Sequence, residues 1–222
     1  MNHRTRLDGA SIRSRNALRE RPPHLFSYVL KADTGFAPNP FMGRCTLAAC
    51  KPIIRRTAQV GDWVVGTGSA HHMASGRVVY AMEVTQKVAF DRYDKGFPMK
   101  RPGKGKRKRH GDNIYYRGPS GHYRQRKNTH HGPADMKRDL SGRYVLVSEH
   151  FYYLGDGHVR IPPGLRSIVM RGPGHKRIKD EKTVGRFVQW IEGMGGGSGR
   201  LGEPLDDGEC STAPPERCHP PC

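Results

Sequence analysis

The sequence lacks any long apolar run. No stretch of its 222 residues approaches the about 20 consecutive apolar residues that cross a bilayer. The N-terminal residues MNHRTRLDGASIRSRN contain no apolar segment of the kind that signal peptides have. Hydrophobic residues make up only 35% of the chain and gather between about Leu25 and Ile191. We therefore expect a cytoplasmic protein with one core, and no membrane partner.

Cysteine is scarce and odd in number. Cys45 and Cys50 lie in the middle of the chain, and Cys210, Cys218 and Cys222 lie near its end. This distribution is not typical of a disulfide framework, so we expect reduced thiols. The spacings also fit neither a zinc knuckle nor another known metal pattern. The sequence therefore predicts no metal site and no cofactor.

Acidic residues are few, and the net charge is +19. Residues 95–131 alone carry one acid, Asp112, against twelve basic residues: Lys95, Lys100, Arg101, Lys104, Lys106, Arg107, Lys108, Arg109, Arg117, Arg124, Arg126 and Lys127. So dense a positive charge repels itself unless a polyanion neutralises it. Tyrosines and histidines are interleaved with the charges and offer rings for base stacking. Nucleic-acid binding is favoured over a loop that merely aids solubility.

Composition divides the chain into three parts. Residues 1–23 predict a flexible basic arm, residues 24–192 a folded domain with residues 95–131 as a basic insertion, and residues 193–222 a disordered tail rich in Gly, Pro and Cys. Neither end is expected to build the site.

Hydrophobic periodicity predicts many short strands and few helices. Alternating residues indicate strands at 24–31, 63–67, 78–84, 143–148, 158–161 and 167–170. Residues 44–51 fit either a strand or a helix, and residues 52–58 a helical turn. A helix after Asp180, with Val184, Phe187 and Ile191 on one face, should end at Gly193. We expect an α+β fold, a small partly open β-barrel with peripheral helices.

The stretch YVLKADTGFAPNPFMGRCTLAACKPIIRRTAQVGDWVVGTGS, residues 28–69, resembles the nucleotide modification associated domain 2 family. The blocks GDNIY at 111–115, FYY at 151–153 and GPGH at 172–175 also match that family's pattern. The resemblance implies association with systems that make, read or process modified DNA bases, and it implies no particular reaction. The order of elements is also similar to PUA-like modules such as EVE and ASCH domains, which hold a single or flipped base beside a barrel.

The loop at residues 33–40 offers groups suited to a base pocket. Phe36 can stack, Asn39 can donate and accept, and Asp33 can accept from an exocyclic amine. The same residues suit a turn shaped by glycine and proline, and both interpretations stay open. Lys51 and Arg55, which follow the loop, are candidates for phosphate contacts.

Further candidates lie in other loops. Thr67 and Ser69 end a glycine-containing strand, where a plain turn is the alternative. Asp112 should stay ionised amid cations and can serve a base or act as a counter-ion, with Asn113 and Tyr115 beside it. His175 suits a phosphate contact or, if there is catalysis, acid–base work. Lys104, Lys106, Arg107, Lys108 and Arg109 should contact the backbone.

These features favour a DNA-binding module of a base-modification or phage-defence system. It would grip DNA with the basic segment and recognise a modified or flipped base in an adjacent pocket, with base-modifying enzymes as possible partners. The alternative is an enzyme that modifies a nucleotide or base, with weak candidates in Asp112, His175 and Cys45. A further alternative is a PUA-like module that binds RNA. No familiar catalytic motif decides between them.

Overall fold

The computed structural model describes residues 21–71, 74–105 and 108–206 of the chain. The largest sheet has seven strands in the order β11-β1-β3-β4-β9-β12, with β10 added against β4. Its strands are β1 (Leu25–Leu30), β3 (Trp63–Gly68), β4 (Arg77–Glu83), β9 (Phe151–Tyr153), β10 (Val159–Arg160), β11 (Lys176–Ile178) and β12 (Gly199–Arg200). β1 runs parallel to β3, and β3 pairs antiparallel with β4.

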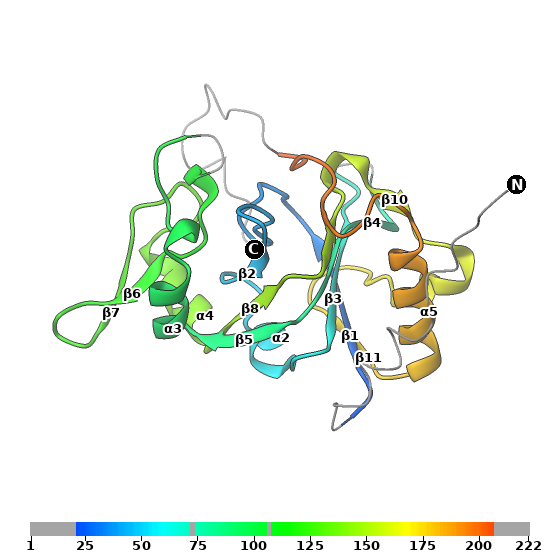
Figure 1. Cartoon of the computed structure of the whole chain (residues 1–222), viewed down its shortest axis with the longest axis horizontal. Coiled ribbons are helices and arrows are strands. Elements are labelled where there is room, and N and C mark those ends of the chain that lie inside the picture. Colours follow the sequence, from blue (N-terminus) through cyan, green and yellow to red (C-terminus); the bar gives the residue numbers. More distant parts are fainter. Residues whose placement is uncertain (1–20, 72–73, 106–107, 207–222) are drawn as a thin grey trace, which may run out of the picture.

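Two smaller sheets complete the strand structure. The three-stranded sheet has the order β2-β8-β5 and comprises β2 (Cys45–Leu47), β8 (Tyr144–Ser148) and β5 (Gln86–Ala89). A hairpin pairs β6 (Tyr115–Arg117) with β7 (Tyr123–Gln125) and projects from one end of the molecule (Figure 1). The fold is α+β as expected, but none of these sheets closes into a barrel within the described residues.

The helices lie outside the sheets. They are α2 (Pro52–Thr57), α3 (Phe90–Gly96), α4 (Met136–Leu140) and α5 (Glu181–Glu192). Short 3-10 helices occupy Pro98–Lys100, Lys108–His110, Pro133–Asp135, Gly155–Gly157 and Pro163–Ile168. The last of these overlaps the strand predicted at 167–170, which is therefore wrong. α5 follows the prediction, because Asp180 accepts the Thr183 backbone N–H and Gly193 ends the helix.

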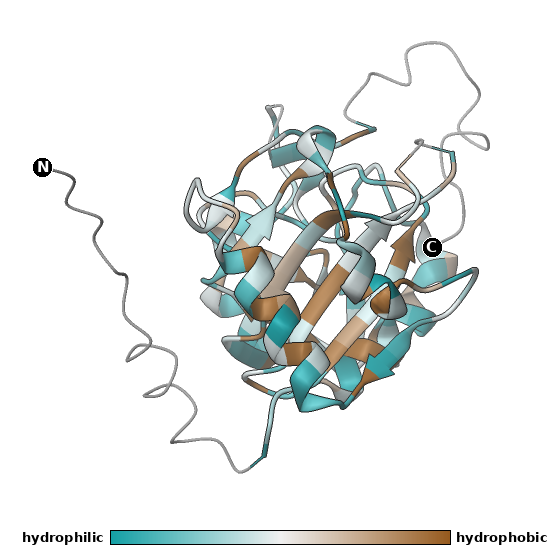
Figure 2. Cartoon of the chain, turned by 90° about the vertical axis from the view of Figure 1, so that its right-hand side faces the viewer, coloured by the Kyte–Doolittle hydropathy of each residue, from teal (hydrophilic) through white to brown (hydrophobic). Residues whose placement is uncertain are grey.

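Three hydrophobic clusters arrange these elements in layers. The first lies between the large and the small sheet, and the second packs α5 against the other face of the large sheet. The third lies between the small sheet and α3, with β6 beside it. Figure 1 shows this order from α5 at the right to the hairpin at the left, and Figure 2 shows hydrophobic residues concentrated on the strands. Strands β1, β3 and β4 are buried on both faces for this reason.

One predicted strand face is interrupted. Simple alternation places Val78 with Tyr80 and Met82, yet Val78 packs in the second cluster while Tyr80 and Met82 pack in the first. The cause is a register shift between Gly66 and Thr67, where Gly66 pairs with Tyr80 but Thr67 pairs with Val78. An extra residue in one strand of a pair turns the following side chains to the opposite face.

The structure also differs from the predicted domain boundary at residue 193. Gly199 and Arg200 form β12, which pairs with Tyr152 and Tyr153 of β9. The backbone N–H of Leu205 then donates to Asp33. The chain therefore adds to the folded domain as far as residue 206. The predictions for residues 1–20 and 207–222 lie outside the described residues.

Candidate functional site

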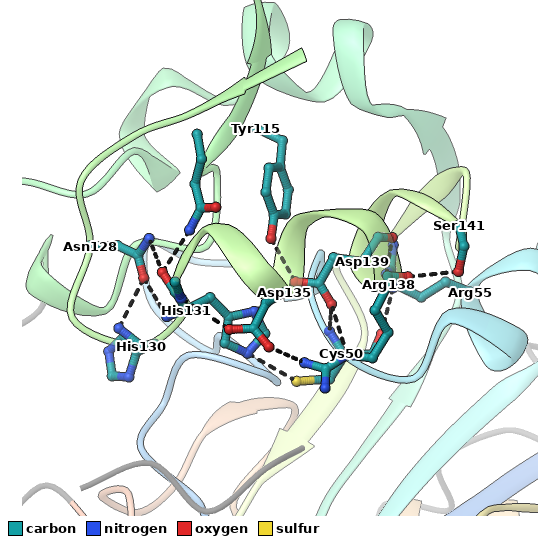
Figure 3. A network of polar contacts seen from close by, with 12 residues as sticks. Cys50, Arg55, Tyr115, Asn128, His130, His131, Asp135, Arg138, Asp139 and Ser141 are labelled. Carbon is teal, nitrogen blue, oxygen red and sulfur yellow. Dashed lines mark hydrogen bonds and ion pairs between the residues drawn. The ribbon is translucent and has the colours of Figure 1, made fainter. Parts of the chain in front are cut away.

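Three side chains from distant parts of the sequence meet at helix α4: Cys50, His131 and Asp139 (Figure 3). The Cys50 sulfur lies 3.5 Å from His131 Nε2, and His131 Nδ1 lies 2.6 Å from Asp139 Oδ2. Asp139 Oδ1 accepts the Cys50 backbone N–H at 2.9 Å. Cys50 is 4% exposed, His131 8% and Asp139 0%. We call these three residues the Cys50 triad.

The carboxylate of Asp139 fixes the histidine. Burial alone would raise the pKa of Asp139, but hydrogen bonds from His131 and Tyr115 and the charge of Arg55 together lower it. Tyr115 Oη donates to Asp139 Oδ2 at 2.8 Å. Because an ionised carboxylate only accepts hydrogen bonds, the ring proton of neutral His131 lies on Nδ1. Nε2, the ring nitrogen without a proton in that tautomer, therefore faces the Cys50 sulfur.

Arg55 joins the two chain segments that carry the triad. Its Nε donates to the Cys50 carbonyl at 2.7 Å, Nη2 to the Asp139 carbonyl at 2.5 Å, and Nη1 to the Tyr144 carbonyl at 2.8 Å. Arg55 is fully buried, and burial lowers its pKa to about 10. Arg55 therefore supports the site from within, whereas the sequence predicted a phosphate contact.

The backbone at Cys50 is in an uncommon conformation. Cys50 has φ 55° and Lys51 has φ 40°, and left-handed values of this kind are rare for residues other than glycine. The hydrogen bonds from Cys50 N–H to Asp139 and from Arg55 to the Cys50 carbonyl hold this peptide on both sides. Such conformations persist only where surrounding contacts determine them, often at functional sites.

The two central cysteines differ. Cys45 is free and fully buried, and burial raises the pKa of its thiol far above its usual range, which argues against the nucleophile suggested from the sequence. Cys50 is disulfide-bonded, which corrects the expectation that both thiols are reduced. Sequence spacing could not reveal this difference, because it depends on what surrounds each sulfur.

The loop at residues 33–40 directs its predicted base-contacting groups inward. Asp33 Oδ1 accepts from Tyr153 Oη at 2.5 Å. Asn39 Nδ2 donates to the His110 carbonyl at 2.7 Å, so its amide holds the loop. Phe36 is 3% exposed and stacks on His130 with ring centroids 4.6 Å apart. The half-buried ring of His130 therefore covers one face of Phe36.

A buried lysine ties the basic segment to this loop. Lys100 Nζ donates to Asn39 Oδ1 at 2.6 Å and to the Arg44 carbonyl at 2.7 Å. Asp112 is also buried and accepts from Thr46 and Tyr93, each at 2.6 Å. Burial raises the pKa of Asp112, whereas the charge of Lys100 and the hydrogen bonds from Thr46 and Tyr93 act to lower it. Both residues stabilise the interior.

Lys100 should make stability depend on alkaline pH. Burial lowers its pKa to about 8, although the charge of Asp112 acts in the opposite direction. Between this value and the about 10.4 of an unfolded lysine, the unfolded chain binds more protons, so stability rises with pH. From about pH 7.5 to about pH 9.5 the wild type should gain about 2 kcal/mol relative to Lys100→Met. Urea unfolding of both proteins at the two pH values measures this difference. An equal change with pH in the free energy of unfolding of the two proteins would contradict the prediction.

Four further candidates gather near the ends of β1 and β3. Thr67 Oγ1 donates to the Tyr28 carbonyl at 3.2 Å, and Lys51 Nζ lies 4.6 Å from the Tyr28 ring centroid. The half-buried Ser69 has a hydroxyl with no partner in the described part of the chain. His175 packs near Phe26, and burial, followed by the charge of Lys51, lowers its pKa.

The remaining candidates lie in the basic segment. Lys104 and Lys108 are exposed, and Arg109 Nε donates to His110 Nε2 at 2.9 Å. Asn113 is buried, and its amide donates to the Phe97 carbonyl at 3.0 Å. Lys106 and Arg107 lie outside the described residues.

Comparison with known protein families covers nearly the whole described part of the chain. A model of the nucleotide modification associated domain 2 family matches residues 22–210. The chain belongs to this family. Neither a curated protein nor a solved structure matches it. The region matched to nucleotide modification associated domain 2 contains the entire Cys50 triad and the basic segment.

Two absences characterise the described residues of this nucleotide modification associated domain. In the described ranges, no three His, Cys, Asp or Glu side chains are grouped so that they could hold a metal ion. Among the same residues, no helix combines the length and apolar character needed to cross a membrane.

Sequence reasoning did not find the Cys50 triad. The sequence predicts Cys50 to be a reduced thiol that fits no zinc pattern, indicates stacking for the histidines of residues 95–131, and gives no signal for Asp139. His131 lies 81 residues from Cys50, although it is only eight residues from Asp139. The one available signal was the pair of His131 and Asp139 at short spacing before a helix, which by itself is common.

Proposed function

We propose that this protein binds nucleic acid, with DNA as the first candidate, as a component of a nucleotide-modification system. The observation that carries the proposal is the set of exposed cations between residues 95 and 131 that have no carboxylate partner among the described residues, on a chain that belongs to this family. These cations are Lys95, Lys104, Lys108, Arg124 and Lys127. Exposed cations of this kind neutralise phosphates and release counter-ions, so they supply affinity without sequence preference.

Three other basic residues of the segment form ion pairs with carboxylates of helix α3. Arg101 and Arg126 both pair with Asp94, and Arg117 pairs with Asp91. The pairs of Arg117 and Arg126 connect the base of the hairpin to α3, whereas Arg101 lies outside the hairpin. The grip on DNA is therefore assigned to the exposed set, which is smaller than the twelve cations of the sequence.

A cavity of about 400 Å³ beside the loop suits a base. It begins at Pro40 and is lined by Phe41, Phe151, Glu149 and Arg200, which combine aromatic walls with an acceptor and a donor. Pockets of this size and mixture hold small ligands. We place base recognition here, since most of the loop from Asp33 to Asn39 is turned inward. The antiparallel pair β3–β4 and the small sheet facing it support the related proposal of a partly open, PUA-like barrel.

Salt dependence tests the proposal directly. Affinity for a duplex or single-stranded oligonucleotide, measured by fluorescence anisotropy, should fall steeply between about 50 mM and 200 mM salt. Lys104→Ala with Lys108→Ala should weaken binding roughly tenfold and reduce the salt slope by about 2, because each phosphate contact contributes about one unit. Binding that is weak and insensitive to salt would refute the function.

Two controls sharpen this experiment. The exposed pair Lys179 and Lys182 lies at α5, on the side opposite the hairpin (Figure 1), so its double alanine variant should bind as the wild type does. Competition between DNA and RNA of matched sequence separates DNA binding from the alternative of an RNA-binding module. Competition between plain and modified oligonucleotides tests whether a modified base is recognised.

A further inference from the structure

Within the described residues, the Cys50 triad has the geometry of an activated nucleophile. Nucleophilic catalysis by cysteine needs a base within hydrogen-bond reach of the sulfur and a third group that orients the base. His131 Nε2 is 3.5 Å from the Cys50 sulfur, and Asp139 Oδ2 is 2.6 Å from His131 Nδ1. Asp139 also holds the Cys50 backbone N–H, so one carboxylate positions both partners.

We propose that Cys50, in its thiol form, is a catalytic nucleophile that adds to C6 of a pyrimidine base, with His131 as the base and Asp139 as a positioning residue. The choice of substrate rests on the proposed function, which brings nucleic acid to this protein. A thiolate is a soft nucleophile, and C6 of a pyrimidine is a conjugate-addition position. The phosphodiester, in contrast, is shielded by negative charge.

The addition balances without an oxidant or a metal. The Cys50 thiol proton moves to His131 Nε2, and the sulfur lone pair forms the S–C6 bond. The C5–C6 double bond becomes a single bond, and its electron pair moves to C5 and the conjugated O4 of uracil or thymine, or N3 of cytosine. The imidazolium of His131, stabilised by Asp139, then returns the proton to C5. Reversal of these steps releases the base and restores the thiol.

The disulfide at Cys50 sets a condition for this chemistry. A disulfide sulfur carries no proton and cannot add to a base, so a thiol reductant must first convert Cys50 to the thiol. The thiols of the reductant are oxidised to a disulfide, and Cys50 is released as a thiol. We therefore expect activity only after treatment with a reductant such as dithiothreitol.

Alkylation tests the nucleophile without any nucleic acid. After reduction, iodoacetamide should alkylate Cys50 at neutral pH at least about tenfold faster than it alkylates the thiol of free glutathione. The pH profile of the rate should show a group that titrates below the usual cysteine range. Cys45 should stay unlabelled, because it is fully buried and has no base beside it. His131→Gln should slow labelling at least about tenfold.

The assignment of Cys50 as a nucleophile is overturned if, in the reduced wild type, iodoacetamide alkylates Cys50 no faster than it alkylates glutathione at neutral pH. It is also overturned if His131→Gln, shown by urea unfolding to be folded, labels as fast as the wild type. The pH profile of the wild type serves where that variant does not fold, and a profile like that of glutathione counts against the proposal.

A trapping experiment tests the substrate. Reduced protein is incubated with oligonucleotides that contain 5-fluorouracil or 5-fluorocytosine, and a denaturing gel then reports covalent adducts. An adduct at Cys50, located by peptide mass spectrometry and absent when the reductant is withheld, supports addition at C6. Salt-dependent binding of the same oligonucleotides without any adduct overturns the substrate assignment but leaves the proposed function intact. Loss of binding itself refutes the proposed function instead.

Discussion

Arg55→Ala is expected to lower the free energy of unfolding by about 3–5 kcal/mol, the range typical of removing one member of a buried charged network. The guanidinium donates to the carbonyls of Cys50, Asp139 and Tyr144, and each would lose its partner inside the protein. Water cannot easily replace these bonds, because Arg55 is fully buried. Truncation would also remove the stacking of Arg55 over Phe90.

Arg56→Ala is the matched control. Arg56 is the next residue of α2 and is exposed, with only a long contact of 3.5 Å to the Ser141 carbonyl. Its replacement should change the free energy of unfolding by no more than about 0.5 kcal/mol. Urea unfolding of both variants gives the comparison, and equal losses in the two would show that Arg55 does not hold the site together.

Asp139→Asn should cost about 2–4 kcal/mol even though the two side chains have nearly the same shape. The carboxylate accepts three hydrogen bonds, from Cys50 N, Tyr115 Oη and His131 Nδ1. An amide has one oxygen and an NH₂ group, so at least one of these donors would face another donor. The same change should slow alkylation of reduced Cys50, because His131 would no longer be oriented.

The loss of unfolding free energy caused by Asp139→Asn should become smaller at acid pH. The folded protein lowers the pKa of Asp139, so its carboxylate contributes stability above the unfolded value of about 3.9. That contribution is lost as the pH falls through the folded pKa, and the wild type should approach the variant there. Unfolding measured at several pH values between about 2 and 5 follows this convergence.

Asp135→Asn provides the contrast for this experiment. Asp135 lies in the same segment but is partly exposed and pairs with Arg138, which is 37% exposed. Surface ion pairs of this kind contribute about 0–1 kcal/mol. A gap between wild type and Asp139→Asn that stays constant across the acid range, like that of Asp135→Asn, would contradict the assigned role of the carboxylate.

Strands and the last helix were predictable because their signals are local. The alternation in Leu25–Leu30 and the Asp180 cap of α5 each depend on residues within one element. Strand β5 and helices α3 and α4 were missed, since they are short and two of them lie beside dense charge. The strand expected at 167–170 became a 3-10 helix because Ile168 packs in the cluster under α5, which alternation cannot foresee.

The candidate site was only partly predictable. The sequence identified the loop at 33–40 as a candidate for base contacts. In the structure, however, Lys100 donates a hydrogen bond to Asn39 inside the protein, and the two residues are 61 positions apart in the chain. The basic segment was identified from charge alone, yet Asp91 and Asp94, just before it in the chain, neutralise three of its arginines. Charge counts treat every lysine and arginine alike, whereas burial and pairing separate them.

The sequence by itself determined the family, the α+β class and the excess of positive charge, because composition, motifs and short periodic patterns are properties of neighbouring residues. Only the tertiary structure decided which polar groups act together. It placed Cys50, from the turn between β2 and α2, against His131 and Asp139, and it buried Lys100, Arg55 and Asp112 in the interior. The physical reason is that burial and hydrogen bonding depend on contacts between residues far apart in the chain, and no local pattern encodes those contacts.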